Sequence, residues 1–169
     1  MIRINKAILP LGFTANGIAC GIKKANKLDL ALFYSLKPAK VACQFTSNKI
    51  QAAPIKLNKH YLTKNKEFQA IIVNSGNANC FTGIRGLRDA EETSKSLAKI
   101  LRLKKERILL SSTGIIGERL PVLKIKEALP KLVSGLSKQG IAKAKKAIMT
   151  TDKFAKELTA QFNLGNARV

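Results

Sequence analysis

The chain has little histidine, few aromatic residues and no tryptophan. Its 169 residues include one histidine, seven phenylalanines, two tyrosines and three cysteines. A histidine-rich metal site is excluded by this composition, and an aromatic platform for stacking nucleic-acid bases is not evident. Cys20, Cys43 and Cys80 are odd in number and form no CxxC pair, so we expect neither a disulfide framework nor a zinc site.

Long apolar runs are also missing, since none approaches the roughly 20 residues that span a bilayer. The first eleven residues contain no apolar segment followed by a small-residue cleavage site of the secretory type. We therefore expect a cytoplasmic protein without membrane association. An apolar content of 46% in a chain of this length predicts one ordinary domain, residues 1–169, with a real core.

Several catalytic signatures are absent from the chain. There is no GxSxG elbow, HExxH or GxGxxG, and residues 111–117 lack the spacing of a phosphate-binding loop. The single histidine, His60, stands in a lysine-rich stretch that we expect to be exposed. A Ser-His-Asp or Cys-His mechanism therefore finds little support.

Positive charge is abundant. Thirty-one Lys and Arg residues against ten Asp and Glu give a net charge of +21 at pH 7. Because clustered cations release counterions from phosphate, a basic nucleic-acid-binding module is an alternative function. Lysines outnumber arginines, however, and are spread along the chain, whereas phosphate and base recognition favours the planar arginine fork. We therefore favour a solvated basic surface and no nucleic-acid partner.

Short apolar runs bounded by turn residues predict strands in the first half of the chain, with mostly helices in the second. The runs with strand character are residues 13–22, 28–36, 40–46, 68–73, 108–112 and 154–164. The expected class is α/β or α+β, with helices packed on sheet.

Apolar spacing predicts a helix over Asp89–Leu101, with Asp89 as the N-cap and Glu92 completing a capping-box-like arrangement. A second helix is expected to begin near Pro121 and to break or kink near Leu129, because Pro130 lacks the backbone donor that a helix needs. A further helix is expected over residues 141–149.

Three polar segments that follow apolar elements are the candidate functional parts. Asn74–Gly83 is either a tight loop whose asparagines satisfy backbone groups or a site-forming loop at a strand end. In Ser111–Gly117, the Thr113 hydroxyl and the Gly114 N–H can point at one spot, as an oxyanion hole requires; the alternative is an ordinary strand-to-helix turn. Met149–Lys156 is either a polar pocket wall or a helix terminus with local hydrogen bonds.

Together and in this order, these segments resemble the ornithine acetyltransferase (glutamate N-acetyltransferase) family. The resemblance rests on NSGNAN, STGIIG followed by LP, and AIMTTD, and on the shorter stretches GFTANGIACGIK, DLAL, FTSN and AAPI. It runs from Gly12 to about Lys156, and the set of motifs in sequence is more specific than any one of them.

The resemblance implies a layered sandwich in which helices enclose β-sheets, the DmpA/ornithine acetyltransferase-like fold. Members are precursors that cut themselves at an Ala-Thr bond into α and β chains. The new N-terminal threonine of the β chain takes acetyl from N-acetylornithine and passes it to glutamate, in arginine biosynthesis; some members also use acetyl-CoA. Such a threonine carries its own base, the α-amine, so neither a histidine nor a cofactor is required.

By the same resemblance, the Thr113 hydroxyl and the Gly114 N–H match the family's oxyanion pair, and Thr150 matches a substrate-binding position. Thr151 and Asp152 are expected to shape the same pocket. The expected partner is the β chain of the same precursor, in a heterotetramer of two α and two β chains.

The chain departs from the family pattern in three places. The cleavage motif, a KGSGM-like stretch leading into Ala-Thr-Met, is absent before Val169, so we expect an α-chain portion that is truncated before the cleavage site and inactive alone. Phe81 replaces a cysteine or small residue and is expected to crowd the asparagine loop, while Lys153 replaces a polar residue. A related self-cleaving aminopeptidase or amidase is the alternative enzyme.

Overall fold

The computed structural model describes residues 3–5, 8–165 and 167–168. Its main sheet has the strand order β2-β3-β4-β5. These strands are β2 (Phe13–Ile18), β3 (Leu30–Lys40), β4 (Glu67–Asn77) and β5 (Ile108–Ile115). Strand β3 is antiparallel to both of its neighbours, β2 and β4, whereas β4 and β5 are parallel. The segments that follow β4 and β5 in sequence therefore leave the sheet at the same end, beside the carboxyl ends of these two strands.

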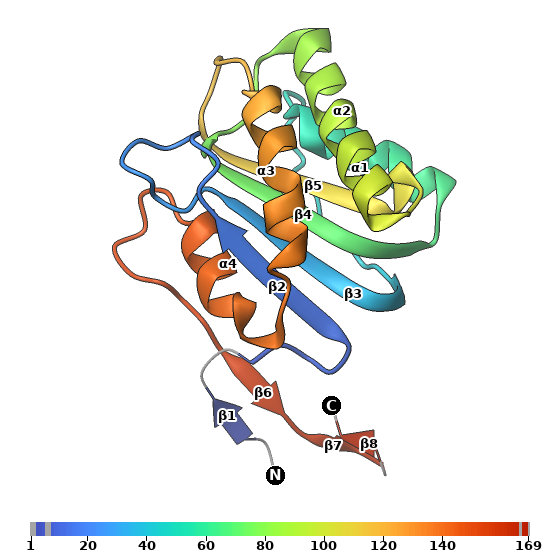
Figure 1. The fold of residues 1–169 in the computed structure, drawn as a ribbon. Helices are drawn as coiled ribbons and strands as arrows, with labels where there is room; N and C mark the ends of the chain where they lie inside the picture. The colour runs from blue at the N-terminus through green and yellow to red at the C-terminus, as the bar shows by residue number, and fades with distance from the viewer. Residues whose placement is uncertain (1–2, 6–7, 166, 169) are drawn as a thin grey trace.

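Helices pack on both faces of this sheet (Figure 1), namely α1 (Ala53–Lys64), α2 (Gly83–Leu101), α3 (Val122–Ser134) and α4 (Ile141–Ile148). Leu30 and Leu32 of β3 belong to the large core cluster with Leu97 of α2, whereas Ala31 between them belongs to a smaller cluster with Ala144 of α4. Because successive strand residues point to opposite faces, α4 covers the face opposite to α2. The predicted α/β class with helices layered on sheet is confirmed.

Small residues let α4 approach the sheet closely. A Cβ placed on Gly17 of β2 would lie 2.4 Å from the Lys143 carbonyl oxygen of α4, so a side chain at position 17 would force the two elements apart. Four fully buried alanines fill the rest of this contact: Ala15, Ala31, Ala144 and Ala147. The end of α4 is thereby held against the sheet.

The remaining short elements complete the described chain. Two small strand pairs, β1 with β6 and β7 with β8, lie away from the layered body in Figure 1. Their bounds, with those of two 3-10 turns, are β1 (Arg3–Asn5), β6 (Thr159–Gln161), β7 (Asn163–Leu164), β8 (Ala167–Arg168), η1 (Lys105–Arg107) and η2 (Lys138–Gly140). None of the helices in the described residues is long and apolar enough to cross a membrane.

The strands expected over 13–22, 28–36, 68–73 and 108–112 form, as does the helix expected over 141–149. Residues 19–22 and 28–29 lie outside the strands, however, and the helix ends at residue 148. The strand expected over 40–46 is wrong, because β3 ends at residue 40 and residues 41–48 have no regular structure. Only short pieces of the expected 154–164 strand form. Helix α1 was not expected. Its buried residues Ala53, Leu57 and Tyr61 have helical spacing, but this spacing is hard to recognise in a lysine-rich sequence.

The predicted capping role of Asp89 is wrong. Helix α2 begins at Gly83 with Thr82 as the N-cap, so Asp89 lies inside the helix. Its buried carboxylate instead pairs with Arg119, whose Nε lies 3.5 Å from Oδ2, and Glu92 pairs with Lys126 at 2.7 Å. The helix starts early because Thr82 is held by the preceding loop, as described below.

The break predicted near Leu129 is wrong, because α3 continues through Pro130 to Ser134. A proline inside a helix costs about 3 kcal/mol. Leu129 and Leu132, on either side of it, are fully buried, and burying a leucine side chain stabilises by roughly 2 kcal/mol. The two buried leucines together outweigh the cost of the proline, so tertiary packing overrides the local preference.

Candidate functional site

The predicted oxyanion pair lies at the end of β5. Thr113 pairs in register with Ser75 of β4, and Gly114 pairs with Gly76. Thr113 is half-buried and Gly114 is exposed. The Thr113 hydroxyl makes no hydrogen bond within the described part of the chain. Since β5 extends to Ile115, the pair belongs to the end of the strand, and the segment leaves the strand after it and leads toward α3 (Val122–Ser134).

The two strand ends are pressed together at this point. Gly114 has φ +134°, and a Cβ there would lie 2.4 Å from the Gly76 carbonyl carbon and 2.5 Å from the Asn77 nitrogen. The register is irregular here, because Asn77 pairs with both Thr113 and Ile115. Irregularities of this kind redirect backbone and side chains, and they are common beside active sites.

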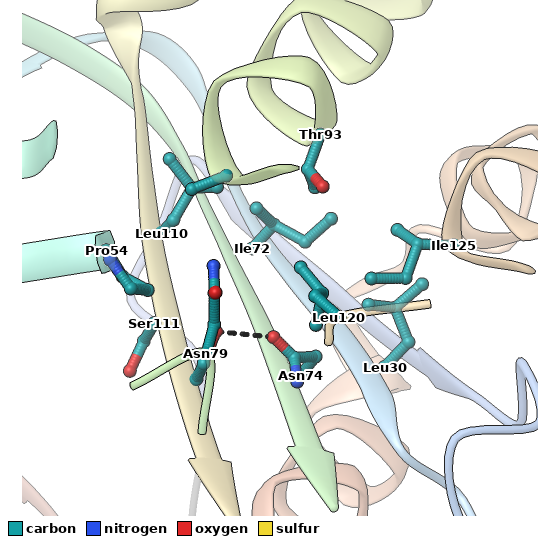
Figure 2. A pocket seen from close by; sticks show the side chains of 12 residues that line it. Leu30, Pro54, Ile72, Asn74, Asn79, Thr93, Leu110, Ser111, Leu120 and Ile125 are labelled. Carbon is teal, nitrogen blue, oxygen red and sulfur yellow. Dashed lines mark hydrogen bonds between the residues drawn. The ribbon is translucent and has the colours of Figure 1, made fainter. Parts of the chain in front are cut away.

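The asparagine segment is a structural support for this strand end. Figure 2 shows the Asn74 and Asn79 side chains in an interior cavity lined mainly by aliphatic side chains such as Ile72 and Leu110. Ser112 Oγ donates to Asn74 Oδ1 at 2.6 Å, and Asn74 Nδ2 donates to the Asn77 carbonyl at 2.8 Å. Buried amide groups need such partners, so Asn74 links the two strands internally.

Asn77 and Asn79 connect the end of β4 to two segments, the one that follows β4 and the one that follows β5. Asn77 Nδ2 donates to the Glu118 and Arg119 carbonyls, both at 3.2 Å, and its Oδ1 accepts from the Asn79 N–H at 2.8 Å. Asn79 Nδ2 donates to the Gly86 carbonyl at 2.9 Å. The buried asparagines therefore satisfy local backbone groups, which is the loop interpretation of this segment.

Phe81 does not crowd this loop, contrary to expectation. Its side chain is 75% exposed, and the residue has φ +61°. The loop is held instead by the Thr82 hydroxyl, which donates to Asn79 Oδ1 at 3.0 Å, so that α2 begins immediately afterwards. A larger residue is tolerated at position 81 because its side chain points to solvent.

Sequence reasoning missed a second support, built around Asp29. This carboxylate is fully buried and accepts backbone N–H bonds from Cys20 at 2.7 Å, Ile22 at 2.7 Å and Lys23 at 2.9 Å. The loop between β2 and β3 is thus wrapped around one anion. Burial, together with the negative charge of Asp29, raises the pKa of the Cys20 thiol to about 12, so this cysteine is a poor nucleophile at neutral pH.

The Thr150 segment leaves the C-terminal end of α4. Thr150, Thr151 and Asp152 are all exposed. The Asp152 carboxylate pairs with Lys156 at 2.9 Å and lies 3.4 Å from the Thr150 nitrogen; the hydrogen bond from Lys156 lowers the pKa of Asp152. This local bonding accounts for Asp152 without a ligand, and nothing in the described contacts assigns Thr151 to a pocket.

Thr150 nevertheless lies near the edge that holds Thr113. Ser75, the register partner of Thr113, is fully buried and donates its hydroxyl to the Ala147 carbonyl at the end of α4. Lys23 Nζ donates to the Met149 carbonyl, immediately before Thr150. Three sequence-distant segments therefore meet at the carboxyl ends of β4 and β5, where α/β folds commonly place their ligands.

A family model described as the ArgJ family matches residues 14–169 of the chain. The chain belongs to the ArgJ family. It is 44% identical over 159 residues to the arginine biosynthesis bifunctional protein ArgJ of Caldanaerobacter subterraneus subsp. tengcongensis, a match covering 94% of this chain. It is 46% identical over 159 residues to the protein of the same name from Dehalococcoides mccartyi, covering 92%. These matches span only 39% and 38% of the relatives' own lengths.

Solved structures agree with this membership. The ArgJ crystal structure from Bacillus halodurans superimposes with a TM-score of 0.91 at 32% identity, covering 99% of this chain and 90% of that one. The ornithine acetyltransferase from Mycobacterium tuberculosis, complexed with ornithine, superimposes with a TM-score of 0.87 at 34% identity, covering 94% and 87%. This ArgJ-family chain therefore has the layered fold that its motifs predicted.

Proposed function

We propose that this ArgJ-family chain carries the oxyanion-stabilising part of an enzyme of arginine biosynthesis that transfers acetyl from N-acetylornithine to glutamate. The observation that carries the proposal is the Thr113 hydroxyl, which has no partner in the described residues and stands beside the exposed Gly114 at a strand end. Relatives named as bifunctional proteins of arginine biosynthesis, and a solved homologue complexed with ornithine, support the substrate assignment.

In the proposed reaction, a threonine hydroxyl attacks the acetyl carbonyl of N-acetylornithine, and its proton passes to the α-amine of the same threonine. The tetrahedral oxyanion accepts hydrogen bonds from the Thr113 O–H and the Gly114 N–H. Collapse breaks the C–N bond as the α-ammonium returns the proton to the departing nitrogen, which releases ornithine and leaves an acetyl ester on the threonine oxygen. The glutamate amine then attacks this ester, and its proton passes through the α-amine to the threonine oxygen as the C–O bond breaks, which regenerates the threonine and releases N-acetylglutamate. Thr150 would contact the substrate.

The nucleophile in this scheme belongs to a β chain of the same precursor, paired with this chain in a heterotetramer. The family resemblance supports this assignment. Among the described cysteines, Cys20 is a poor nucleophile, because burial raises the pKa of its thiol to about 12. Within the described residues, no group of three His, Cys, Asp or Glu side chains could hold a metal ion.

The proposal can be tested in a chimera in which this chain replaces the matching part of the Caldanaerobacter relative. Ornithine and N-acetylglutamate formation from N-acetylornithine and glutamate is measured for the parent chimera, for Thr113→Val and for Thr113→Ser. Loss of one oxyanion donor should lower kcat about 10²- to 10³-fold in Thr113→Val, whereas Thr113→Ser keeps the hydroxyl and most activity.

Equal rates for Thr113→Val and the parent would contradict the oxyanion role. A folded chimera that hydrolyses peptides or amides but forms no N-acetylglutamate would instead support the related aminopeptidase or amidase.

A further inference from the structure

Lys23 lies between the two parts of the proposed site. A Cβ placed on Gly76, the register partner of Gly114, would be 3.0 Å from Lys23 Cγ, so the lysine stem packs directly against the end of β4. The ammonium at the other end of the side chain donates to the Leu28 carbonyl at 3.1 Å and to the Met149 carbonyl. One side chain thus contacts both the strand end and the segment that leads into Thr150.

The backbone of Lys23 is itself fixed. Its N–H donates to Asp29 Oδ2 at 2.9 Å, beside the N–H of Ile22 at 2.7 Å, and this carboxylate is fully buried. The Asp29 N–H donates to the Ile18 carbonyl, and the Asp29 carbonyl accepts from the Ser75 N–H at 2.8 Å. The lysine side chain therefore extends from a loop whose backbone is fixed by hydrogen bonds, and this fixes where its ammonium lies.

The carbonyl that Lys23 contacts is well placed to control Thr150. Met149 is the C-cap of α4, and its carbonyl shares one peptide plane with the Thr150 N–H. Fixing that oxygen fixes the direction in which the chain continues. A cation also suits this place, because a helix C-terminus carries partial negative charge and unsatisfied carbonyls. The Ser75 hydroxyl donates a hydrogen bond to a neighbouring carbonyl of the same helix end, that of Ala147.

Burial lowers the pKa of Lys23, and the negative charge of Asp29 opposes this effect. The ammonium keeps two carbonyl partners in this partly buried place, those of Leu28 and Met149.

We propose that Lys23 is a positioning residue for the acetyl transfer, holding the Met149–Thr150 peptide at a fixed place relative to the Thr113–Gly114 pair. The expected effect of Lys23 on catalysis rests on the proposed function, whereas the contacts that Lys23 makes do not. It predicts that loss of the ammonium releases the Thr150 segment while the strand end that carries Thr113 stays in place.

The geometry can be tested on the 169-residue chain alone by amide hydrogen exchange. Lys23→Met should speed exchange of the peptide covering the last turn of α4, residues 145–149, at least about tenfold, because the C-cap carbonyl of that helix loses its hydrogen bond from a charged group. Peptides from β4 and α2 should be unchanged. Lys124→Met is the matched control, because Lys124 Nζ also donates to a carbonyl of the same loop, that of Gly21 at 2.9 Å, but makes no hydrogen bond to α4 in the described residues.

Lys23→Arg is the second variant, since it keeps a cation and its donors and should restore part of the protection. If Lys23→Met does not fold, Lys23→Arg carries the test: its 145–149 peptide should exchange faster than that of the parent, with β4 unchanged. Unchanged exchange at 145–149, or equal loosening of every peptide, would overturn the positioning role.

The catalytic consequence is measured in the chimera. Lys23→Met should raise KM for N-acetylornithine about tenfold or more with a smaller change in kcat, whereas Lys124→Met should leave both unchanged. A parent chimera that exchanges as predicted but transfers no acetyl group would defeat the proposed function and leave the positioning geometry intact. Altered exchange with unchanged KM and kcat would overturn the link between Lys23 and catalysis.

Discussion

Gly76 and Gly114 lie opposite each other on the parallel strands β4 and β5, and the backbone after Gly76 occupies the space that a side chain at position 114 would need. This contact brings the ends of the two strands together beside Thr113. Because the colliding atoms are backbone atoms, no rotamer change can relieve the clash. The glycine at 114 is thus required by the close approach of the two strands.

Replacing Gly114 with alanine should therefore destabilise the chain strongly. The new Cβ would lie 2.4 Å from the Gly76 carbonyl carbon, at a φ of +134° that residues with a side chain rarely adopt. We expect a loss of about 3 kcal/mol or more in the free energy of unfolding, measured by urea denaturation.

Gly117→Ala is the matched control for this substitution. Gly117 also has a positive φ, +84°, but a Cβ there meets no atom within 4 Å. Only backbone strain applies, so we expect a loss of about 1 kcal/mol. Equal losses for the two variants would show that the close approach of β4 is not the cause.

Asp29→Asn should loosen the loop between β2 and β3. The carboxylate accepts three backbone N–H bonds, whereas an asparagine amide brings an NH₂ group to face at least one of those donors. We expect a loss of about 2 to 4 kcal/mol in the free energy of unfolding, with faster amide exchange at Cys20, Ile22 and Lys23.

The exposed Asp152 provides the comparison, since Asp152→Asn removes only a surface pair with Lys156 and should change stability little. Undisturbed exchange in residues 20–23 of Asp29→Asn would mean that the loop is held by other contacts.

The main strands of the sheet could be read from the sequence because buried strands are short apolar runs that end at turn residues. Residues 68–73 show this clearly, since the run stops at Asn74 although β4 itself continues to Asn77. The start of α2 could not be read, because it depends on the hydrogen bond from Thr82 to Asn79 and not on the acidic residue at position 89. Local patterns identify elements, whereas tertiary contacts set their ends.

The site was predictable only in part. The resemblance pointed to Thr113, Gly114 and Thr150, and the strand register places the first two at one sheet edge. Lys23 could not be found, because its ammonium meets a carbonyl 126 positions away in sequence. Asp29 is similar, since an aspartate beside an apolar run gives no sign that three backbone donors will surround it. Contacts that depend on the folding of a loop leave no periodic signal.

Cys20 should be nearly inert to alkylation in the folded chain. Its pKa is raised to about 12 by burial and by Asp29, so at pH 8 only about one thiol in ten thousand is ionised. Cys43 is exposed and should react first. Iodoacetamide labelling followed by peptide mass spectrometry distinguishes the two, and in urea both should label at similar rates. Folded-state labelling of Cys20 as fast as Cys43 would contradict the buried environment.

Glu91 should contribute a small, pH-dependent part of the stability. Lys105 Nζ lies 2.5 Å from Glu91 Oε1 and Lys95 Nζ lies 3.3 Å from it. The hydrogen bond from Lys105 lowers the pKa of Glu91 below its ordinary 4.5. The unfolded chain therefore binds the proton more readily, so the stabilisation is fully present above pH 4.5 and is lost as pH falls through the folded-state pKa.

Glu91→Gln should accordingly cost less than about 1 kcal/mol in the free energy of unfolding at pH 7, because both partners are a third exposed and screened by solvent. The difference from the parent should shrink as urea titrations are repeated at decreasing pH below 4.5. Glu127→Gln is the control, since Glu127 is exposed on α3 and makes no ion pair in the described structure. A Glu91→Gln difference that stays constant with pH would show that packing, and not the carboxylate charge, is what position 91 contributes.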